Sequence, residues 1–560
     1  MSRGGRVAAR ASAGALLALV GAIAVSAVLV GCGDAAPAGR ARHSVLLVTF
    51  DTTRPDAFGC TGGRAGTTPH VEALAAEGIV FESARTVAPL TLPAHASMLT
   101  GLVPLRHGLH DNGLEALAPA AQTLAELARE QGFATGAFVG SLVLDRAYGL
   151  DQGFDVYTEP ADAGDVHDFH FPERPASEVA DDAIAWLDGA ARERPFFGWL
   201  HFYDPHAPHT PKHVKPATPA PDDPQGWTAY LAEVQETDAA LGRVLDALKR
   251  QQRYDDTTIL VTADHGESFG AHGEITHGMY VYDATLRVPF VLRRADRAHA
   301  GTRDAGVASV VDVFPTLADA LGFEVAATDG VSLYDGRAPR ERIAFCETYF
   351  PWLAYGWSGL AGAWDREFKY LHSSKSELYD LAQDPREERN LLPGAAARVA
   401  PYRAALEALA KKGRLSSAAT GVDHSAAMAK MGYTGASGPP PEWPEPLDDS
   451  QRRAPLDGRD ELRAVMRSAE LAHGARWLEV LVKLEEVLAA NPSNWIALDH
   501  RAYALLQLNR HAESLEAYRR LEKDGPRWPA TKANIATCLI GLGRPAEALG
   551  VLDERIAADP

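Results

Sequence analysis

The chain has 560 residues, of which 46% are hydrophobic and 23% are charged, and its formal net charge is -19 at pH 7. This length exceeds that of one ordinary domain, and the composition is that of a globular protein. The acidic balance argues against a nucleic-acid partner, because phosphate backbones are bound by an excess of Lys and Arg. An anionic substrate is not excluded, since a metal ion or a local cluster of His and Arg can hold one.

Residues 1–32 have the pattern of a secretory signal. Three arginines precede an apolar run of twenty residues, which ends in the letters LVGC with the cysteine at Cys32. This ending resembles a bacterial lipobox and implies that Cys32 is lipidated. An uncleaved membrane anchor is the alternative, because the run is long enough to span a bilayer. In both cases we expect an exported, membrane-anchored protein on the periplasmic or cell-surface side.

Residues 43–395 alternate apolar runs with helical patterns. The runs with the length and composition of buried strands lie at 45–50, 195–203, 257–264 and 288–293. Helical periodicity appears between them, for example at 119–132 and 231–251. Strands that alternate with helices predict an α/β fold with a mostly parallel central sheet that helices cover on both faces.

The remainder of the chain predicts a linker and a helical tail. Residues 396–458 are predicted to hold a terminal helix and then a linker rich in Gly and Pro. From 459 to 560, several residue types recur at a step of 34, as in Pro492, Pro526 and Pro560, Arg476, Arg510 and Arg544, and Glu479, Glu513 and Glu547. This period resembles the tetratricopeptide repeat and implies an all-α tail that contacts a protein partner, which the sequence does not identify.

Polar side chains follow three of the predicted strands at the point where each strand ends. The first is followed by Asp51, the second by Asp204 and His206, and the third by Asp264 and His265. Ligands of open α/β sheets bind beyond the carboxyl ends of the strands, so we expect these groups to face one crevice. Each carboxylate alone is explained equally well as a helix cap. Together they predict a site for a divalent metal ion, which Asp oxygens and neutral His nitrogens suit.

Several ordered motifs resemble the sulfatase branch of the alkaline phosphatase superfamily. They are "LVTFDTTRPDAFGCTG", "LTLPAHASMLTG", "DPHAPH", "TADHGESFGAHGEITHG" and the late "ELYDLAQDPREERNLL". The resemblance covers residues 43–395. It implies an alkaline-phosphatase-like sheet, a small C-terminal subdomain and hydrolysis of a sulfuric or phosphoric ester with one divalent metal ion, either Ca, Mn or Zn.

The resemblance also implies roles for individual residues. The metal ligands would be Asp51, Thr91, Asp264 and His265. Thr91 would be the nucleophile, with His206 and His277 near the anionic oxygens and the leaving group. His95 takes the place of an Arg of the nucleophile loop, and Arg54 would hold either that region or the anion.

Besides His95, this sequence departs from the sulfatase pattern at three further places. Thr91 stands where sulfatases oxidise Cys or Ser to formylglycine; a secondary alcohol would give a ketone, so we expect no formylglycine. Thr52 replaces the second Asp of the usual metal pair. The letters GAFVGS at 136–141 replace an element that supplies a sulfate-binding Lys and His. The pattern is similar to that of relatives with a Thr nucleophile, which include nucleotide phosphodiesterases and phosphoethanolamine transferases.

The predicted chemistry does not decide whether the substrate is a sulfuric or a phosphoric ester. Thr91 would attack sulfur or phosphorus, and protonated His206 and His277 would stabilise the negative charge. A Thr–phosphate intermediate is chemically ordinary, whereas overall similarity favours sulfate. Three interpretations remain: a sulfatase-family ester hydrolase, a phosphodiesterase or phosphoethanolamine- or phosphoglycerol-type transferase acting on envelope lipid or glycan, and a catalytically degenerate binding protein that uses its tail.

Overall fold

The computed structural model describes residues 43–160, 173–220, 223–224, 226–418, 441–449, 451–526 and 529–558. The predicted signal or anchor at 1–32 therefore lies outside the described residues. Within the described ranges, no helix is both long enough and apolar enough to cross a membrane.

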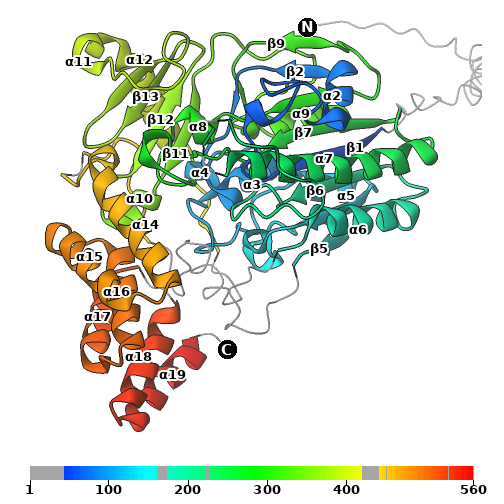
Figure 1. Ribbon diagram of the computed structural model, residues 1–560. Coiled ribbons are helices and arrows are strands. Elements are labelled where there is room, and N and C mark those ends of the chain that lie inside the picture. Colours follow the sequence, from blue (N-terminus) through cyan, green and yellow to red (C-terminus); the bar gives the residue numbers. More distant parts are fainter. Residues whose placement is uncertain are drawn as a thin grey trace, which may run out of the picture. The chain divides into compact units, whose positions relative to one another are not determined.

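The central sheet has eight strands in the order β5-β4-β6-β1-β7-β8-β2-β9. Their bounds are β1 Ser44–Phe50, β2 Ile79–Phe81, β4 Ala134–Val139, β5 Val156–Thr158, β6 Phe196–Phe202, β7 Thr257–Ala263, β8 Phe290–Arg293 and β9 Thr302–Asp304. Neighbouring strands are parallel except at β8, which runs antiparallel to both β7 and β2. The predicted mostly parallel sheet is confirmed, and it contains all four predicted strands (Figure 1).

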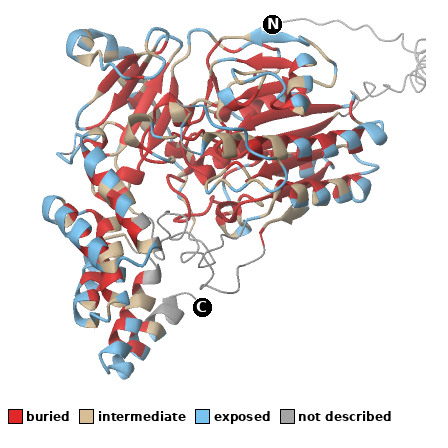
Figure 2. Cartoon of the chain, in the orientation of Figure 1, coloured by how far each residue is buried: buried red, intermediate tan, exposed pale blue. Residues whose placement is uncertain are grey.

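Helices cover both faces of this sheet. Alternate residues of β1 enter two different cores: Val45 and Leu47 enter one, and Leu46 and Val48 enter the other. The first core includes residues of α3 (Thr91–Thr100), α5 (Leu124–Glu130) and α9 (Val313–Leu321), and the second those of α2 (Pro69–Ala76), α6 (Ala176–Asp188) and α7 (Trp227–Arg250). Figure 2 shows the strands buried between these helices, whose outer surfaces are exposed. Burial on both faces explains why the strands are continuous apolar runs.

Short elements connect these layers. The two-stranded parallel sheet consists of β3 (Ala84–Arg85) and β10 (Ala308–Ser309). The short helices are η1 Pro55–Ala57, α4 Pro104–His107, η2 Leu142–Leu144, η3 Arg146–Tyr148, η4 Ala271–Gly273, α8 Asp283–Leu286 and η5 Val310–Asp312.

A second, antiparallel sheet follows, in the order β11-β12-β13-β14. Its strands are β11 Ala344–Thr348, β12 Leu360–Trp364, β13 Phe368–His372 and β14 Glu377–Asp380, and the helices around it are α10 Phe350–Tyr355, α11 Leu392–Ala395, η6 Ala396–Val399 and α12 Ala400–Ala410. This sheet corresponds to the small C-terminal subdomain that the motifs imply, and β12 and β13 form its hairpin.

The predicted linker contacts the catalytic domain in the parts that are described. The backbone of Ala418 forms a bridge with Ala116. Farther along, the indole of Trp443 donates a hydrogen bond to Glu115 at 3.0 Å and stacks on Tyr349 with ring centroids 5.9 Å apart. Gly- and Pro-rich composition predicted a linker here, and its described ends contact the folded chain through this bridge and these aromatic contacts.

The tail is entirely helical, as predicted. After η7 (Pro455–Gly458) come α14 Arg459–His473, α15 Trp477–Ala490, α16 Trp495–Gln507, α17 His511–Asp524, α18 Pro529–Gly541 and α19 Pro545–Ala558. Consecutive helices pack against each other. The repeated Arg and Glu residues form the same ion pair three times, in Arg476–Glu479, Arg510–Glu513 and Arg544–Glu547. Assignment of this tail to the tetratricopeptide class remains a prediction.

Candidate active site

Three neighbouring parallel strands, β6, β1 and β7, end at one edge of the sheet. Asp51 directly follows β1, and Asp264 with His265 directly follows β7. All three side chains are fully buried, and one potential ligand atom of each lies within 4.8 Å of the others. The structure therefore brings together the three residues that the sequence predicts as metal ligands at strand ends.

In each of the two carboxylates, one oxygen is held by donors and the other has no hydrogen-bond partner. Asp264 Oδ1 accepts the backbone N–H groups of Thr52 at 3.1 Å and His265 at 2.8 Å. Asp51 Oδ2 lies 3.2 Å from the Nε2 atom of His201. Asp264 Oδ2 and Asp51 Oδ1 are buried and have no hydrogen-bond partner. Buried carboxylate oxygens are rarely left without a donor or a cation, so these residues fit a divalent metal ion.

The nucleophile candidate begins a helix beside this group. Thr91 is the first residue of α3, and its Oγ1 atom lies 3.3 Å from His265 Nε2. The side chain of Asn112 accepts the N–H of Leu92 at 2.9 Å, which fixes the first turn. The start of a helix carries a partial positive charge, so this position favours an ionised hydroxyl and an anionic substrate.

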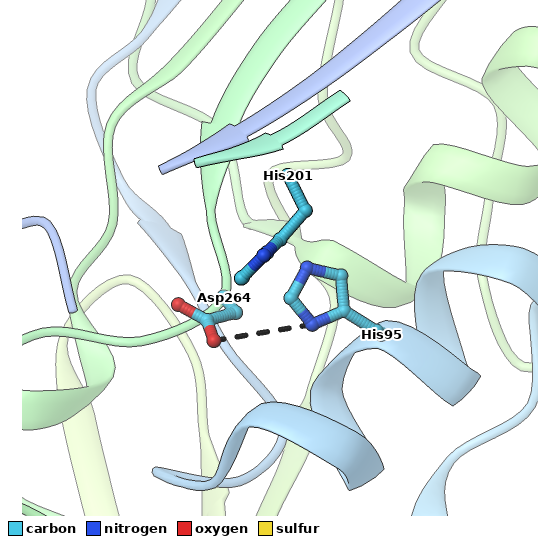
Figure 3. A group of neighbouring side chains, drawn as sticks. All are labelled: His95, His201 and Asp264. Atoms are coloured by element: carbon cyan, nitrogen blue, oxygen red, sulfur yellow. Dashed lines mark ion pairs between the residues drawn. The ribbon is translucent and has the colours of Figure 1, made fainter. Parts of the chain in front are cut away.

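His95 supports the loop from within α3. Its Nδ1 donates to the carbonyl of Thr91 at 2.8 Å, so Nε2 accepts from the hydroxyl of Thr49 at 3.0 Å. Burial lowers the pKa of His95 to about 3, so the ring is neutral. His95 points toward Asp264 (Figure 3) but supplies hydrogen bonds in place of the positive charge of the Arg it replaces.

His277 lies next to His265, and His206 lies next to His277. The ring centroid of His277 is 4.4 Å from that of His265 and 5.1 Å from that of His206. Burial lowers the pKa of His206 to about 3 and that of His277 well below its ordinary value. Burial therefore favours neutral rings in the free protein, and the protonated state that the sequence analysis expects for both rings during the reaction stays a prediction. Glu267 lies beside His277, with Oε2 3.4 Å from Nδ1.

Arg54 holds the loop that carries these groups. Its Nη1 donates to the carbonyl of Glu267 at 3.1 Å, and two other nitrogens bind Asp56 at 2.8 and 2.7 Å. Of the two roles expected for Arg54, support of the loop is the one for which the structure has direct contacts. Asp204 instead accepts the N–H of Ala176 at 2.7 Å at the start of α6, which is a capping contact.

His201 and Asn112 are site residues that the sequence analysis missed. His201 lies within β6, where the only signal is one imidazole in an apolar run. It forms a second group of potential ligands with His95 and Asp264. The group of Asp51, Asp264 and His265 contains both carboxylate oxygens that lack a hydrogen-bond partner, so it is the better match for a divalent metal ion.

The comparisons with known proteins agree with this geometry. A sequence model of the Sulfatase family matches residues 43–323. The uncharacterized sulfatase YidJ of Escherichia coli is 26% identical over 422 residues, which cover 63% of this chain and 83% of that protein. An N-acetylglucosamine-6-O-sulfatase of Bacteroides thetaiotaomicron is 23% identical over 479 residues, covering 65% and 85%.

A solved structure is also similar. The phosphonate monoester hydrolase of Agrobacterium radiobacter superposes with a TM-score of 0.56 at 25% identity, covering 66% of this chain and 95% of that one. With the family match over residues 43–323, the chain belongs to the sulfatase family and is an ester hydrolase of the alkaline phosphatase superfamily.

Proposed function

We propose that this protein is a metal-dependent hydrolase that cleaves the sulfuric or phosphoric ester of a glycan with Thr91 as its nucleophile. One observation carries the proposal: the Thr91 hydroxyl lies 3.3 Å from His265, in a group with two buried carboxylates that each keep one oxygen without a hydrogen-bond partner. The similar N-acetylglucosamine-6-O-sulfatase supports a glycan as the alcohol part of the ester.

The residues that would hold the metal ion are Asp51, Asp264 and His265, together with Thr91. A divalent ion bound there lowers the pKa of a coordinated hydroxyl and screens the charge of an anionic ester. The hydroxyl of Thr52 donates to the carbonyl of Pro205 at 2.9 Å, and it lacks the negative charge of the Asp that it replaces. So few ligands, one of them an imidazole, suit Mn²⁺ or Zn²⁺ better than Ca²⁺, which takes about six to eight oxygens.

The reaction then has two steps on the side chain of Thr91. Its Oγ1 forms a bond to sulfur or phosphorus while the bond to the leaving oxygen breaks, and that oxygen takes up a proton. Water next attacks the same atom, releases sulfate or phosphate and restores the hydroxyl. The neutral rings of His206 and His277 can donate a hydrogen bond or accept a proton in these steps. Glu267, beside Nδ1 of His277, leaves Nε2 as its basic nitrogen.

A phosphodiester or phosphonate ester is the second candidate substrate. It is favoured by Thr91 itself, because a Thr ester lacks the exit that formylglycine provides and must be cleaved by attack at the central atom. Phosphoryl groups on oxygen nucleophiles are routinely cleaved in this way. The similarity to a phosphonate monoester hydrolase supports this candidate.

One assay separates these substrates. Full-length protein loaded with Mn²⁺, Zn²⁺ or Ca²⁺ is compared with its Thr91→Ala variant on an aryl sulfate, an aryl phosphate monoester and an aryl phosphodiester. We expect turnover of at least one ester and its loss in Thr91→Ala. Turnover that survives in Thr91→Ala would rule out Thr91 as the nucleophile. A wild-type protein inactive on all three would support the binding-protein interpretation.

Export and anchoring form a separate part of the proposal. They rest on residues 1–32, whose pattern predicts a lipid on Cys32. Metabolic labelling with a radioactive fatty acid in a bacterial host should mark the wild-type protein. Cys32→Ala should abolish the label, and a persisting label would contradict the lipobox assignment. A search for the protein partner that is proposed for the tail should use a protein that keeps helices α14–α19 intact.

A further inference from the structure

We propose that His201 is a positioning residue that orients the carboxylate of Asp51 for metal binding. Its Nε2 lies 3.2 Å from Asp51 Oδ2, and both side chains are fully buried. The inference rests on the metal-dependent function proposed above and adds a residue to it.

The strand register places His201 where it can reach Asp51. Strand β6 pairs with β1 in parallel, with His201 opposite Thr49. Side chains two residues apart in a strand share a face, so Thr49 points toward the same side as Asp51, two residues later. That side carries α3, from which His95 reaches the hydroxyl of Thr49. Figure 3 shows His201 and His95 approaching Asp264 from the strand and the helix respectively.

The hydrogen bond between the two side chains determines which oxygen of Asp51 is left for a cation. An ionised carboxylate only accepts, so Nε2 of His201 must be the donor. With Oδ2 held in this way, Oδ1 is the atom that lacks a hydrogen-bond partner.

Asp264 also has one oxygen that accepts hydrogen bonds and one that has no hydrogen-bond partner, but its donors are of a different kind. Its Oδ1 accepts two backbone N–H groups, from Thr52 and His265, and its Oδ2 has no partner. The N–H of Thr52, which directly follows Asp51 in sequence, is therefore used by Asp264. Asp51 relies on a side-chain donor from the neighbouring strand. His201 is therefore the donor that a substitution can remove.

A purely structural role does not account for His201. Its Nδ1 is buried and has no hydrogen-bond partner, so the hydrogen bond of this ring is the one with Asp51. An aliphatic residue would fill this position in an apolar strand without burying a polar nitrogen. A role as a metal ligand is less favourable than positioning, because Nε2 is already directed at Asp51 and the group of His95, His201 and Asp264 has one carboxylate, whereas that of Asp51, Asp264 and His265 has two.

The test compares Mn²⁺ binding by full-length variants, measured by isothermal titration calorimetry. Loss of a partner that orients a ligand typically weakens metal binding by about 10- to 100-fold, and this is expected for His201→Leu. His201→Gln keeps an N–H donor near the position of Nε2 and should restore most of the affinity. The matched control is His107→Leu, which removes another buried imidazole that contacts Ser97 and no predicted ligand.

Each outcome decides the matter. Unchanged Mn²⁺ affinity in folded His201→Leu would overturn the proposal, as would equal weakening in His107→Leu. Complete loss of binding in both His201→Leu and His201→Gln would make His201 a ligand and also overturn it. If His201→Leu does not fold, His201→Asn, whose amide is too short to reach Asp51, replaces it with the same expectation. Failure of the proposed function is distinguished by the Thr91→Ala assay and by absence of Mn²⁺ binding in the wild type.

Discussion

Thr91 and His95 occupy the first and last positions of the motif in which sulfatases carry a modified nucleophile and an Arg. In the structure, the residue at the last position hydrogen-bonds the backbone of the residue at the first. The His95 ring donates to the carbonyl of Thr91 and accepts from Thr49, so it fixes the helix start on β1 without adding charge. In the proposed mechanism, positive charge near Thr91 would then come from the start of α3 and from a divalent metal ion.

Glu267 gives a test at this scale. Its carboxylate lies beside Nδ1 of His277, and we expect it to set the tautomer and orientation of that ring. Glu267→Gln keeps the size but removes the negative charge, and should lower kcat by about 10- to 100-fold. Steady-state kinetics on the best aryl ester provide the measurement. Glu274→Gln is the control, since that buried acid accepts the N–H of Met279 instead; an equal loss in both variants would contradict the assignment.

Among the elements, the sequence could predict the strands that have a clear hydrophobic pattern. Continuous apolar runs gave β1, β6, β7 and β8, because these strands are buried on both faces. The same pattern could not give the reversed direction of β8, since apolar composition does not encode strand direction.

The residues of the candidate site also differ in how far the sequence could predict them. Asp51, Asp264 and His265 follow strands and were predicted from that position, whereas His201 lies inside a strand. Its contact with Asp51 depends on the pairing of β6 with β1, which is a long-range feature. The neutral state of His206 and His277 depends on burial, which motifs do not report. The hydrogen bond from Trp443 to Glu115 could not be predicted either, because Trp443 lies in a segment whose composition is that of a linker.

Helix α7 and the end of β6 give a pH-dependent prediction. Burial raises the pKa of Glu233 from 4.5 to about 9, and that of Asp204 from 3.8 to about 7. Between 4.5 and 9 the folded state therefore binds more protons than the unfolded state at Glu233. The free energy of unfolding should consequently fall as pH rises through this range.

Urea denaturation at a series of pH values measures this slope. Glu233→Gln should flatten it, because the amide does not titrate. Glu193→Gln, at an acid whose side chain is 90% exposed, should leave it as in the wild type. A wild-type slope that persists in Glu233→Gln would show that this carboxyl does not cause the loss of stability.

At the scale of the whole molecule, α10 connects the tail to the site. The hydroxyl of Thr348, just before this helix, donates to the carbonyl of Gly278, the residue after His277, at 2.6 Å. At the other end of α10, the carbonyl of Tyr355 accepts from the side chain of Asn491 in the tail at 2.9 Å. The tail is thus hydrogen-bonded to a helix that begins next to the active site.

Gly458 tests how tightly this junction is packed. A Cβ atom added there would lie 2.3 Å from the ring of Trp357, which is fully buried. Gly458→Ala should therefore lower the free energy of unfolding by about 1–3 kcal/mol, the usual cost of overpacking. Chemical denaturation provides the measurement, and Gly394→Ala is the control because no atom lies within 4 Å of its added Cβ. Equal stability of the two variants would show that the junction is loosely packed.

The central claim is that unmodified Thr91 forms a covalent bond to the sulfur or phosphorus of the substrate. Peptide mass spectrometry after acid quenching of the metal-loaded enzyme during turnover tests it most directly. The account predicts an unoxidised Thr91 in the resting protein and one added sulfuryl or phosphoryl group on Thr91 in the quenched sample, with the mass of the group identifying the ester. A modification on another residue, or an oxidised Thr91 at rest, would contradict it.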